Sequence, residues 1–169
     1  MMLPRDVETL QRATPPSVAL STLLELGPMR EGDLQLVLME TFAGNATLAP
    51  EMRFEMRRVP DDVRVGRLNL RFGRASDLLL YCGHIGYEVL PEHRGHHYAA
   101  RSCRMVLPIA KGYGMGELWI TCDPENAASR RTCELAGAEL VEILSVPSEH
   151  ELREHGIVAK CRYRLRVPA

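Results

Sequence analysis

The segment from Gly83 to Ala99 combines residue types that can hold a phosphate group. It has the pattern of a strand, a turn at Arg94-Gly95 and the first turn of a helix. A glycine turn that opens a helix leaves backbone N–H groups unpaired and sets the positive end of the helix dipole beside them. Such a turn binds a pyrophosphate with few side-chain charges, so the spacing predicts a pyrophosphate site at the amides of residues 95–99.

A second segment, from Asp123 to Gly137, places polar side chains at another helix start. Asp123-Pro124 is expected to cap this helix and to put a proline in its first turn. Asn126 and Ser129 follow within one turn, and Gly137 is expected to end the helix. The segment therefore offers an amide and a hydroxyl near the end of the preceding strand.

The two segments resemble the coenzyme A motifs of the GNAT acetyltransferases. Arg94 matches the first position of the family pattern Arg/Gln-x-x-Gly-x-Gly/Ala, Ala99 matches the last, and Gly95 matches the extra glycine common after that arginine. Asn126 and Gly137 match the asparagine and the final glycine of the second motif. The resemblance covers roughly residues 33–167.

One position of the first motif differs, because His97 stands where the family has glycine. Only the side chain changes, so the amide is kept, and His96 and His97 can donate to phosphate when protonated. The resemblance implies that acetyl-CoA is the co-substrate. The residues implied to contact it are Tyr87, Glu88, Val89, Arg94, Gly95, His96, His97, Tyr98, Ala99, Asn126 and Ser129.

The resemblance implies direct acetyl transfer from acetyl-CoA to a primary amine, without an acyl-enzyme. The ammonium must lose a proton, and the thioester oxygen must be stabilised, which the resemblance assigns to an N–H of residues 87–89. His84 and Glu88 are candidate bases, because residues four apart on a regular strand share a face. A buried histidine bonded to backbone and a salt-bridged glutamate are equal alternatives.

The leaving thiolate needs a proton, and the family's usual acid is a tyrosine seven residues after the asparagine. That position is Cys133. A thiol can donate a proton, although a small cysteine packed in the helix is the favoured alternative, and water can serve instead. The missing tyrosine and His97 leave open a second function, a catalytically weak or inactive CoA-binding regulatory module.

The periodicity of apolar residues predicts the elements that position these groups. Alternation predicts strands at 34–39, 52–57, 63–72, 81–90, 117–121, 140–146 and 157–167, with a bulge at Gly66 where the apolar parity switches. Helical spacing predicts a helix from about Ala99, kinked or ended near Pro108, and a second from Asp123 to Gly137. The expected fold class is α/β: a mixed, mostly antiparallel sheet of the GNAT type with helices packed on it, in the order β-β-β-β-α-β-α-β-β.

Residues 1–31 are expected to form an N-terminal segment with short helices at Val7–Leu10 and Val18–Leu26, and residues 32–169 one acetyltransferase domain. The loop from Thr41 to Pro50 is short, whereas the family often has two helices there that wall the acceptor site. The acceptor site is therefore expected to be open, or completed by residues 1–31 or by a second subunit.

Composition excludes several classes of protein. A net charge of −1 over 169 residues gives no field that recruits nucleic acid or an anionic membrane. Five cysteines without a CxxC pair argue against a disulfide framework and a structural zinc site, and fit a cytoplasmic location. No apolar run approaches the roughly 20 residues of a membrane helix. The spacing of His93, His96 and His97 with Glu92 matches no zinc signature, so no metal is expected.

A row of cations on one face of the last strand needs partners. The row comprises Lys160, Arg162, Arg164 and Arg166. Nucleic acid is not the expected partner, because the net charge is near zero and few aromatic residues interleave. A partner subunit, or the nearby Glu149, Glu151 and Glu154, is expected to neutralise the row, and a homodimer is expected. The expected acceptor is a small-molecule or peptide amine.

Overall fold

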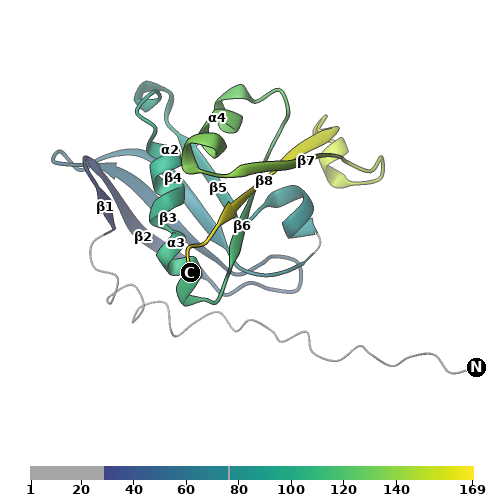
Figure 1. Ribbon diagram of the computed structural model, residues 1–169, viewed down its shortest axis with the longest axis horizontal. Coiled ribbons are helices and arrows are strands. Elements are labelled where there is room, and N and C mark those ends of the chain that lie inside the picture. Colours follow the sequence, from purple (N-terminus) through teal and green to yellow (C-terminus); the bar gives the residue numbers. More distant parts are fainter. Residues whose placement is uncertain (1–28, 76) are drawn as a thin grey trace, which may run out of the picture.

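The computed structural model describes residues 29–75 and 77–169, which form one eight-stranded sheet with helices against it (Figure 1). The strands are β1 (Arg30–Glu31), β2 (Leu34–Phe42), β3 (Glu51–Arg58), β4 (Val63–Arg71), β5 (Ile85–Val89), β6 (Glu117–Cys122), β7 (Glu139–Ser145) and β8 (Ala159–Arg166). They lie in the order β1-β2-β3-β4-β5-β6-β8-β7, and every neighbouring pair is antiparallel except β5 and β6. The mixed, mostly antiparallel fold class predicted from the sequence is confirmed.

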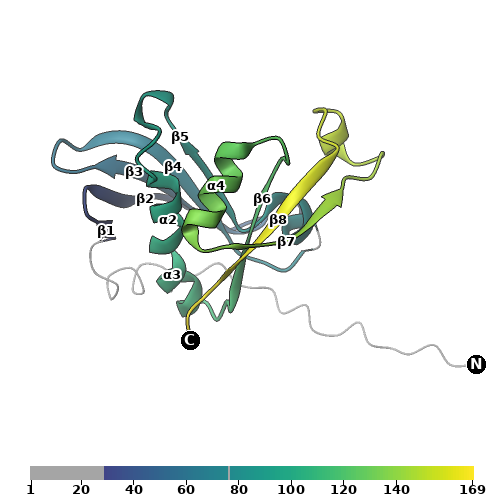
Figure 2. The ribbon, with the colours of Figure 1, turned by 45° about the horizontal axis from the view of Figure 1, so that its top comes forward.

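The helices are α2 (Tyr98–Met105), α3 (Leu107–Gly112) and α4 (Ala127–Ala136), with short helical turns η1 (Leu78–Cys82), η2 (Pro91–His93) and η3 (Glu151–Arg153). Figures 1 and 2 show α2 and α4 side by side over the same face of the sheet. Ala99, Cys103, Val106 and Ala110 are all buried, as their helical spacing predicts. The core lies between this apolar helix face and the strands beneath it.

Two local features match their sequence signals. The pairing of β3 with β4 shifts register after Met56, which lies opposite Gly66, so the predicted bulge at Gly66 is confirmed. The predicted break near Pro108 is also present, because α2 ends at Met105 and α3 begins at Leu107. Proline at the start of α3 is compatible with a new helix, since its missing N–H would be unpaired there anyway.

The predicted start of β5 and the predicted cap of α4 are wrong, and one strand was missed. Tyr81 and Cys82 belong to η1 rather than to the strand, because Gly83 takes a left-handed φ of 73° and the chain becomes extended only after it. The cap of α4 is Asn126, whose Oδ1 accepts from the Ser129 N–H at 2.9 Å, while Asp123-Pro124 forms a turn before the helix. Strand β1 was not predicted, since two residues carry no periodicity.

The cations of β8 find their partners inside the chain, but not where the sequence predicts. Lys160 Nζ lies 2.7 Å from Asp123, Arg162 pairs with Glu142, and Arg164 and Arg166 lie 3.4 and 3.8 Å from Glu139. The expectation that Glu149, Glu151 and Glu154 neutralise the row is therefore wrong. Register explains this result, because β7 runs antiparallel beside β8 and brings its own glutamates alongside.

The helices predicted at Val7–Leu10 and Val18–Leu26 lie outside the described residues. Arg30 and Glu31 already belong to the sheet. Within the described part of the chain, no helix is long and apolar enough to cross a membrane.

Candidate active site

Strands β5 and β6 separate soon after they meet, and this gap is the centre of the candidate site. A single residue pair, Ile85 with Ile120, joins them in register. On the other side of β5, Arg71 N–H donates to His84 O at 2.7 Å and Leu90 N–H donates to Val65 O at 2.9 Å. Since alternate residues of a strand bond to opposite sides, the N–H groups of Tyr87 and Val89 point away from β4 and toward β6.

The gap contains a hollow of about 280 Å³. Tyr87, Asn126 and Ser129 line it from the helix-covered face of the sheet, and Arg71 and Lys160 line it from the other face. Side chains from both faces therefore meet at one opening between two strands. This opening therefore brings residues of the two sheet faces to one hollow.

The loop between β5 and α2 presents a row of backbone N–H groups. In residues 29–75 and 77–169, no acceptor is paired with the amides of residues 95–99. Gly95 and His97 both take left-handed backbone conformations, with φ of 89° and 58°. These two turns aim successive amides outward at the start of α2, as an anion-binding loop requires. The loop therefore suits the pyrophosphate of acetyl-CoA.

The left-handed φ of His97 explains why related loops have glycine there. A residue with a Cβ adopts this conformation at a cost of roughly 1 kcal/mol, which glycine avoids. The side chains of His96 and His97 are exposed, so neither is packed in the core beneath the amides of residues 95–99. The departure from the family pattern thus strains the backbone without removing an N–H.

Arg94 is exposed, and its Nε donates to Val89 O at 3.2 Å. The side chain therefore ties the loop back to the end of β5. This contact holds the start of the loop beside the end of β5.

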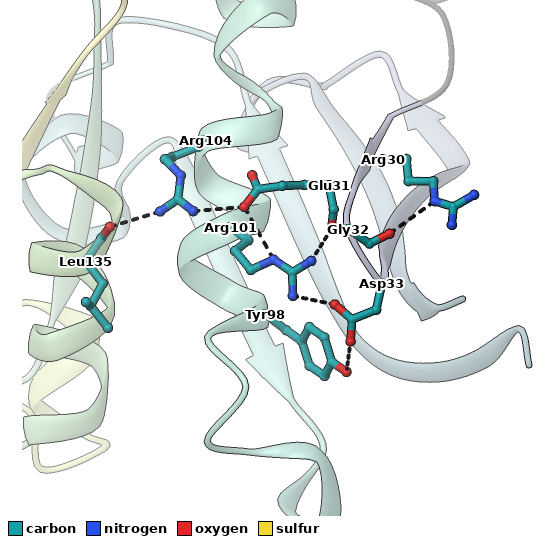
Figure 3. A network of polar contacts seen from close by, with 8 residues as sticks. All are labelled: Arg30, Glu31, Gly32, Asp33, Tyr98, Arg101, Arg104 and Leu135. Atoms are coloured by element: carbon teal, nitrogen blue, oxygen red, sulfur yellow. Dashed lines mark hydrogen bonds and ion pairs between the residues drawn. The ribbon is translucent and has the colours of Figure 1, made fainter. Parts of the chain in front are cut away.

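A polar network holds α2 in place beneath the loop (Figure 3). The buried Tyr98 side chain points away from the loop, and its hydroxyl donates to Asp33 Oδ2 at 3.0 Å. Arg101 donates to Asp33 Oδ1 at 2.7 Å and holds the pKa of that carboxyl below its usual value. Arg104 donates to Leu135 O at 2.9 Å, which links α2 to α4. Only the backbone of Tyr98, and of the buried Ala99, is therefore available to a ligand at the loop.

The second motif meets β5 through Tyr87. Its hydroxyl lies 2.8 Å from Ser129 Oγ, donates to Ser129 O at 3.2 Å, and lies 3.8 Å from Cys133 Sγ. Cys133 is fully buried. The pKa of its thiol is raised, mainly by contact with the Cys122 thiol and also by burial. Cys133 does not line the hollow, whereas Tyr87 does, so the Tyr87 hydroxyl is the more accessible proton donor at this end of the hollow.

His84 is pinned by its backbone neighbours. Its side chain is 3% exposed, Nδ1 accepts from the Trp119 N–H at 3.0 Å, and Nε2 donates to Gly73 O at 3.1 Å. Burial lowers the pKa of the imidazole. With Nδ1 already used as an acceptor, the ring has no lone pair for a substrate proton. His84 instead joins β5 to β6 just before they diverge.

This arrangement predicts acid-sensitive stability. The His84 pKa is lower in the folded chain than the ordinary value of about 6.5. Above pH 6.5 the His84 ring is neutral in both the folded and the unfolded chain, and the folded chain has its full stability. Below pH 6.5 the ring gains a proton in the unfolded chain only, so the free energy of unfolding decreases as the pH falls toward and through the pKa of the folded chain. We expect the free energy of unfolding, measured with urea, to fall between pH 6.5 and 5.

The control is His84→Gln, which is expected to lose about 2 kcal/mol at pH 7.5, because two backbone partners lose their bonds. The same variant should lose less stability than the wild type on acidification. An equal acid response in the two proteins would contradict this role for His84.

Glu88 lies apart from His84, on the exposed part of β5. Its side chain is 54% exposed, and its carboxylate lies 2.8 Å from Arg67. The two predicted base candidates therefore do not form a pair. Of the two side chains, only that of Glu88 is exposed to solvent.

Sequence reasoning missed several groups around the hollow. Arg71 lines it, with Nε 3.4 Å from Glu51 Oε2, and Lys160 lines it while paired with Asp123 at 2.7 Å. These residues come from β3, β4, β8 and the turn after β6, so no local motif joins them. Lys160 did carry a signal as part of the basic row, but its partner could not be identified without the sheet order.

Comparisons with known proteins agree with this geometry. A family model described as an acetyltransferase (GNAT) domain matches residues 9–139. Among solved structures, a GNAT-family acetyltransferase from Bacillus anthracis shares 19% identity with a TM-score of 0.53, covering 68% of this chain and 65% of its own. The microcin self immunity acetyltransferase MccE, solved with acetyl-CoA and AMP, shares 14% identity with a TM-score of 0.54, covering 69% of this chain and 61% of its own. The ribosomal alpha-N-protein acetyltransferase RimL shares 15% identity with a TM-score of 0.54, covering 70% and 71%.

No curated protein sequence matches the chain. The chain spans 65% and 61% of the length of the first two structures. At identities of 19% and 14%, the likeness to these structures shows a shared fold alone. The family model covers most of the chain and includes both the phosphate loop and α4. The chain therefore belongs to the GNAT family of acetyltransferases.

Proposed function

We propose that the protein transfers the acetyl group of acetyl-CoA directly to a primary amine. The observation that carries this proposal is the alignment of two features on β5. The unpaired amides of residues 95–99 lie just beyond its C-terminal end, and the hollow lies along the strand itself. Acetyl-CoA supplies an activated acyl group, and its pyrophosphate and thioester would occupy these two places.

The chain's own groups have distinct roles in this proposal. The amides of residues 95–99 bind the pyrophosphate, and the Tyr87 or Val89 N–H, which faces the gap, stabilises the oxygen of the tetrahedral adduct. Asn126 caps α4, which keeps Ser129 at the hollow. Glu88 takes the proton of the incoming ammonium, and His84 is a positioning residue that anchors β5 to β6.

The acceptor is proposed to enter on the face of the sheet opposite the helices. Arg71, Lys160 and Asp123 line the hollow, and the loop of residues 43–50 between β2 and β3 is too short to cover it with helices. RimL is named for acetylating a protein, and MccE for microcin immunity. Since the relatives are named for different acceptors, the proposal extends to a small-molecule or peptide amine and no further.

A panel assay tests the proposal. The protein would be incubated with acetyl-CoA and with polyamines, amino acids, aminoglycosides and peptides with free N-termini, and mass spectrometry would detect acetylated amine. We expect at least one amine to gain an acetyl group together with stoichiometric release of CoA. Binding of acetyl-CoA without transfer to any amine would favour the regulatory module instead.

Glu88 gives the proposal a pH signature. A general base must be unprotonated in the free enzyme, so kcat/KM should fall on the acidic side of the profile. Glu88→Gln is expected to lower kcat/KM by about 100-fold and to remove the acidic limb. The matched control is Arg67→Gln, which removes the ion-pair partner and leaves the carboxylate. A Glu88→Gln enzyme with full activity and an unchanged profile would mean that the base lies elsewhere.

We also propose a cytoplasmic homodimer. The five cysteines form no disulfide, which suits a reducing compartment. Edge strand β7 exposes Leu140, Val141 and Ile143, and a second copy could cover them. Light scattering at micromolar concentration, which distinguishes one 19.0 kDa chain from two, tests the dimer.

A further inference from the structure

We infer that the Tyr87 hydroxyl is the general acid of this active site, delivering the proton to the departing thiolate with Ser129 beside it. The inference rests on the proposed acetyl transfer and adds the group that completes it. It follows from the position of one hydroxyl pair at the hollow.

The Tyr87 hydroxyl sits where two elements converge. Tyr87 belongs to β5, and its side chain crosses to α4, where its Oη lies 2.8 Å from Ser129 Oγ. Both residues line the hollow between β5 and β6. The N–H of Tyr87 points toward the same gap. A thioester whose oxygen meets that amide therefore has its sulfur within reach of the helix-side wall that the Tyr87 hydroxyl forms.

Other proton donors near this wall are less suited to the role. Cys133 is fully buried, and its Sγ lies behind the Tyr87 hydroxyl at 3.8 Å. The Cys122 thiol also lines the hollow, but contact with the Cys133 thiol lowers its pKa, so it holds its proton less firmly at neutral pH. Lys160 is held by Asp123 at 2.7 Å.

The hydroxyls of Tyr87 and Ser129 suit a general acid that regains its proton from solvent after each turnover. Burial raises the pKa of Tyr87, so the phenol carries its proton throughout the neutral range. The amine, which has given its ammonium proton to Glu88, forms a bond between its nitrogen and the acyl carbon. The carbon–sulfur bond breaks, the electron pair leaves with sulfur, and the second proton of the new amide nitrogen passes to solvent. The phenolic proton then moves to sulfur. Ser129 Oγ donates to the phenolate and passes on a proton from water, which restores Tyr87.

The test compares two Tyr→Phe variants. Tyr87→Phe removes the proposed acid, and Tyr113→Phe is the matched control, because the Tyr113 hydroxyl has no hydrogen-bond partner among the described residues. CoA release would be followed with a thiol reagent, with an amine and with water as acceptor. We expect Tyr87→Phe to lower kcat about 100-fold, with acetyl-CoA affinity within twofold of wild type, and Tyr113→Phe to keep kcat.

A second readout separates chemistry from packing. Incorporation of 3-fluorotyrosine at position 87 keeps the ring and the hydroxyl but makes the phenol more acidic. A general acid requires kcat to change with this acidity while the melting temperature stays constant, and Ser129→Ala should lower kcat less than Tyr87→Phe does.

The outcomes are distinct. A Tyr87→Phe enzyme that keeps kcat within threefold, or that loses only acetyl-CoA affinity, overturns the role of Tyr87 and leaves the proposed function intact. A wild-type protein that binds acetyl-CoA but releases no thiol to any amine or to water overturns the proposed function, and the role of Tyr87 with it.

Discussion

Replacing Gly66 with alanine is expected to lower the free energy of unfolding by about 3 kcal/mol, the upper end of the usual cost of overpacking. A Cβ at Gly66 would overlap the carbonyl oxygen of Glu88 and would lie 3.2 Å from Val89 Cα. Both atoms belong to the backbone of β5, so no side chain can rotate to relieve the contact. Strand β5 must move away from β4 instead.

The matched control is Gly116→Ala, because a Cβ there meets nothing within 4 Å. Thermal unfolding should show a melting temperature lower by about 6–12 °C for Gly66→Ala and little change for Gly116→Ala. Because β5 carries the amides that face the gap, Gly66→Ala should also lose acetyl transfer at temperatures where it is still folded. Equal melting temperatures for the two variants would contradict the close approach of β4 and β5.

Replacing Gly95 with valine is expected to weaken acetyl-CoA binding at least tenfold, about 1.4 kcal/mol. Gly95 has a φ of 89°, which a β-branched residue adopts only under strain, and its amide begins the row proposed to hold the pyrophosphate. A valine would turn that row away from the ligand. Calorimetry with acetyl-CoA measures the change directly.

Gly114→Val is the control for Gly95→Val, since Gly114 also has a left-handed φ, 70°, with nothing within 4 Å of its Cβ position, and lies just beyond α3. It should destabilise the chain without changing the affinity. His97→Gly, which relieves the left-handed histidine and keeps the N–H, should bind at least as tightly as wild type. Unchanged affinity in Gly95→Val would exclude this loop as the pyrophosphate site.

The local structure of the two segments proposed to bind the cofactor could be predicted because its signals are local. Each signal lies within a few residues: Arg94-Gly95 before one helix, and Asn126 with Ser129 three residues later. The structure has Arg94-Gly95 just before α2 and Asn126 as the cap of α4. The bulge at Gly66 was equally local, a switch of parity along one strand.

The catalytic half depends on long-range contacts, which no short pattern records. His84 and Glu88 share a face by spacing, but the turn at Gly83 and the contact with Trp119 bury one and leave the other exposed. The contact between Tyr87 and Ser129 spans 42 residues and requires β5 to lie beside α4. The partners of β8 likewise depended on the pairing of β7 with β8.

A crystal structure of the chain with bound CoA would show where the pyrophosphate and the sulfur of the cofactor lie. We expect pyrophosphate oxygens within about 3.2 Å of the amides of residues 95–99, and the CoA sulfur between β5 and β6 beside the Tyr87 hydroxyl. A pyrophosphate bound away from this loop, or a CoA chain lying outside the gap between β5 and β6, would contradict this expectation.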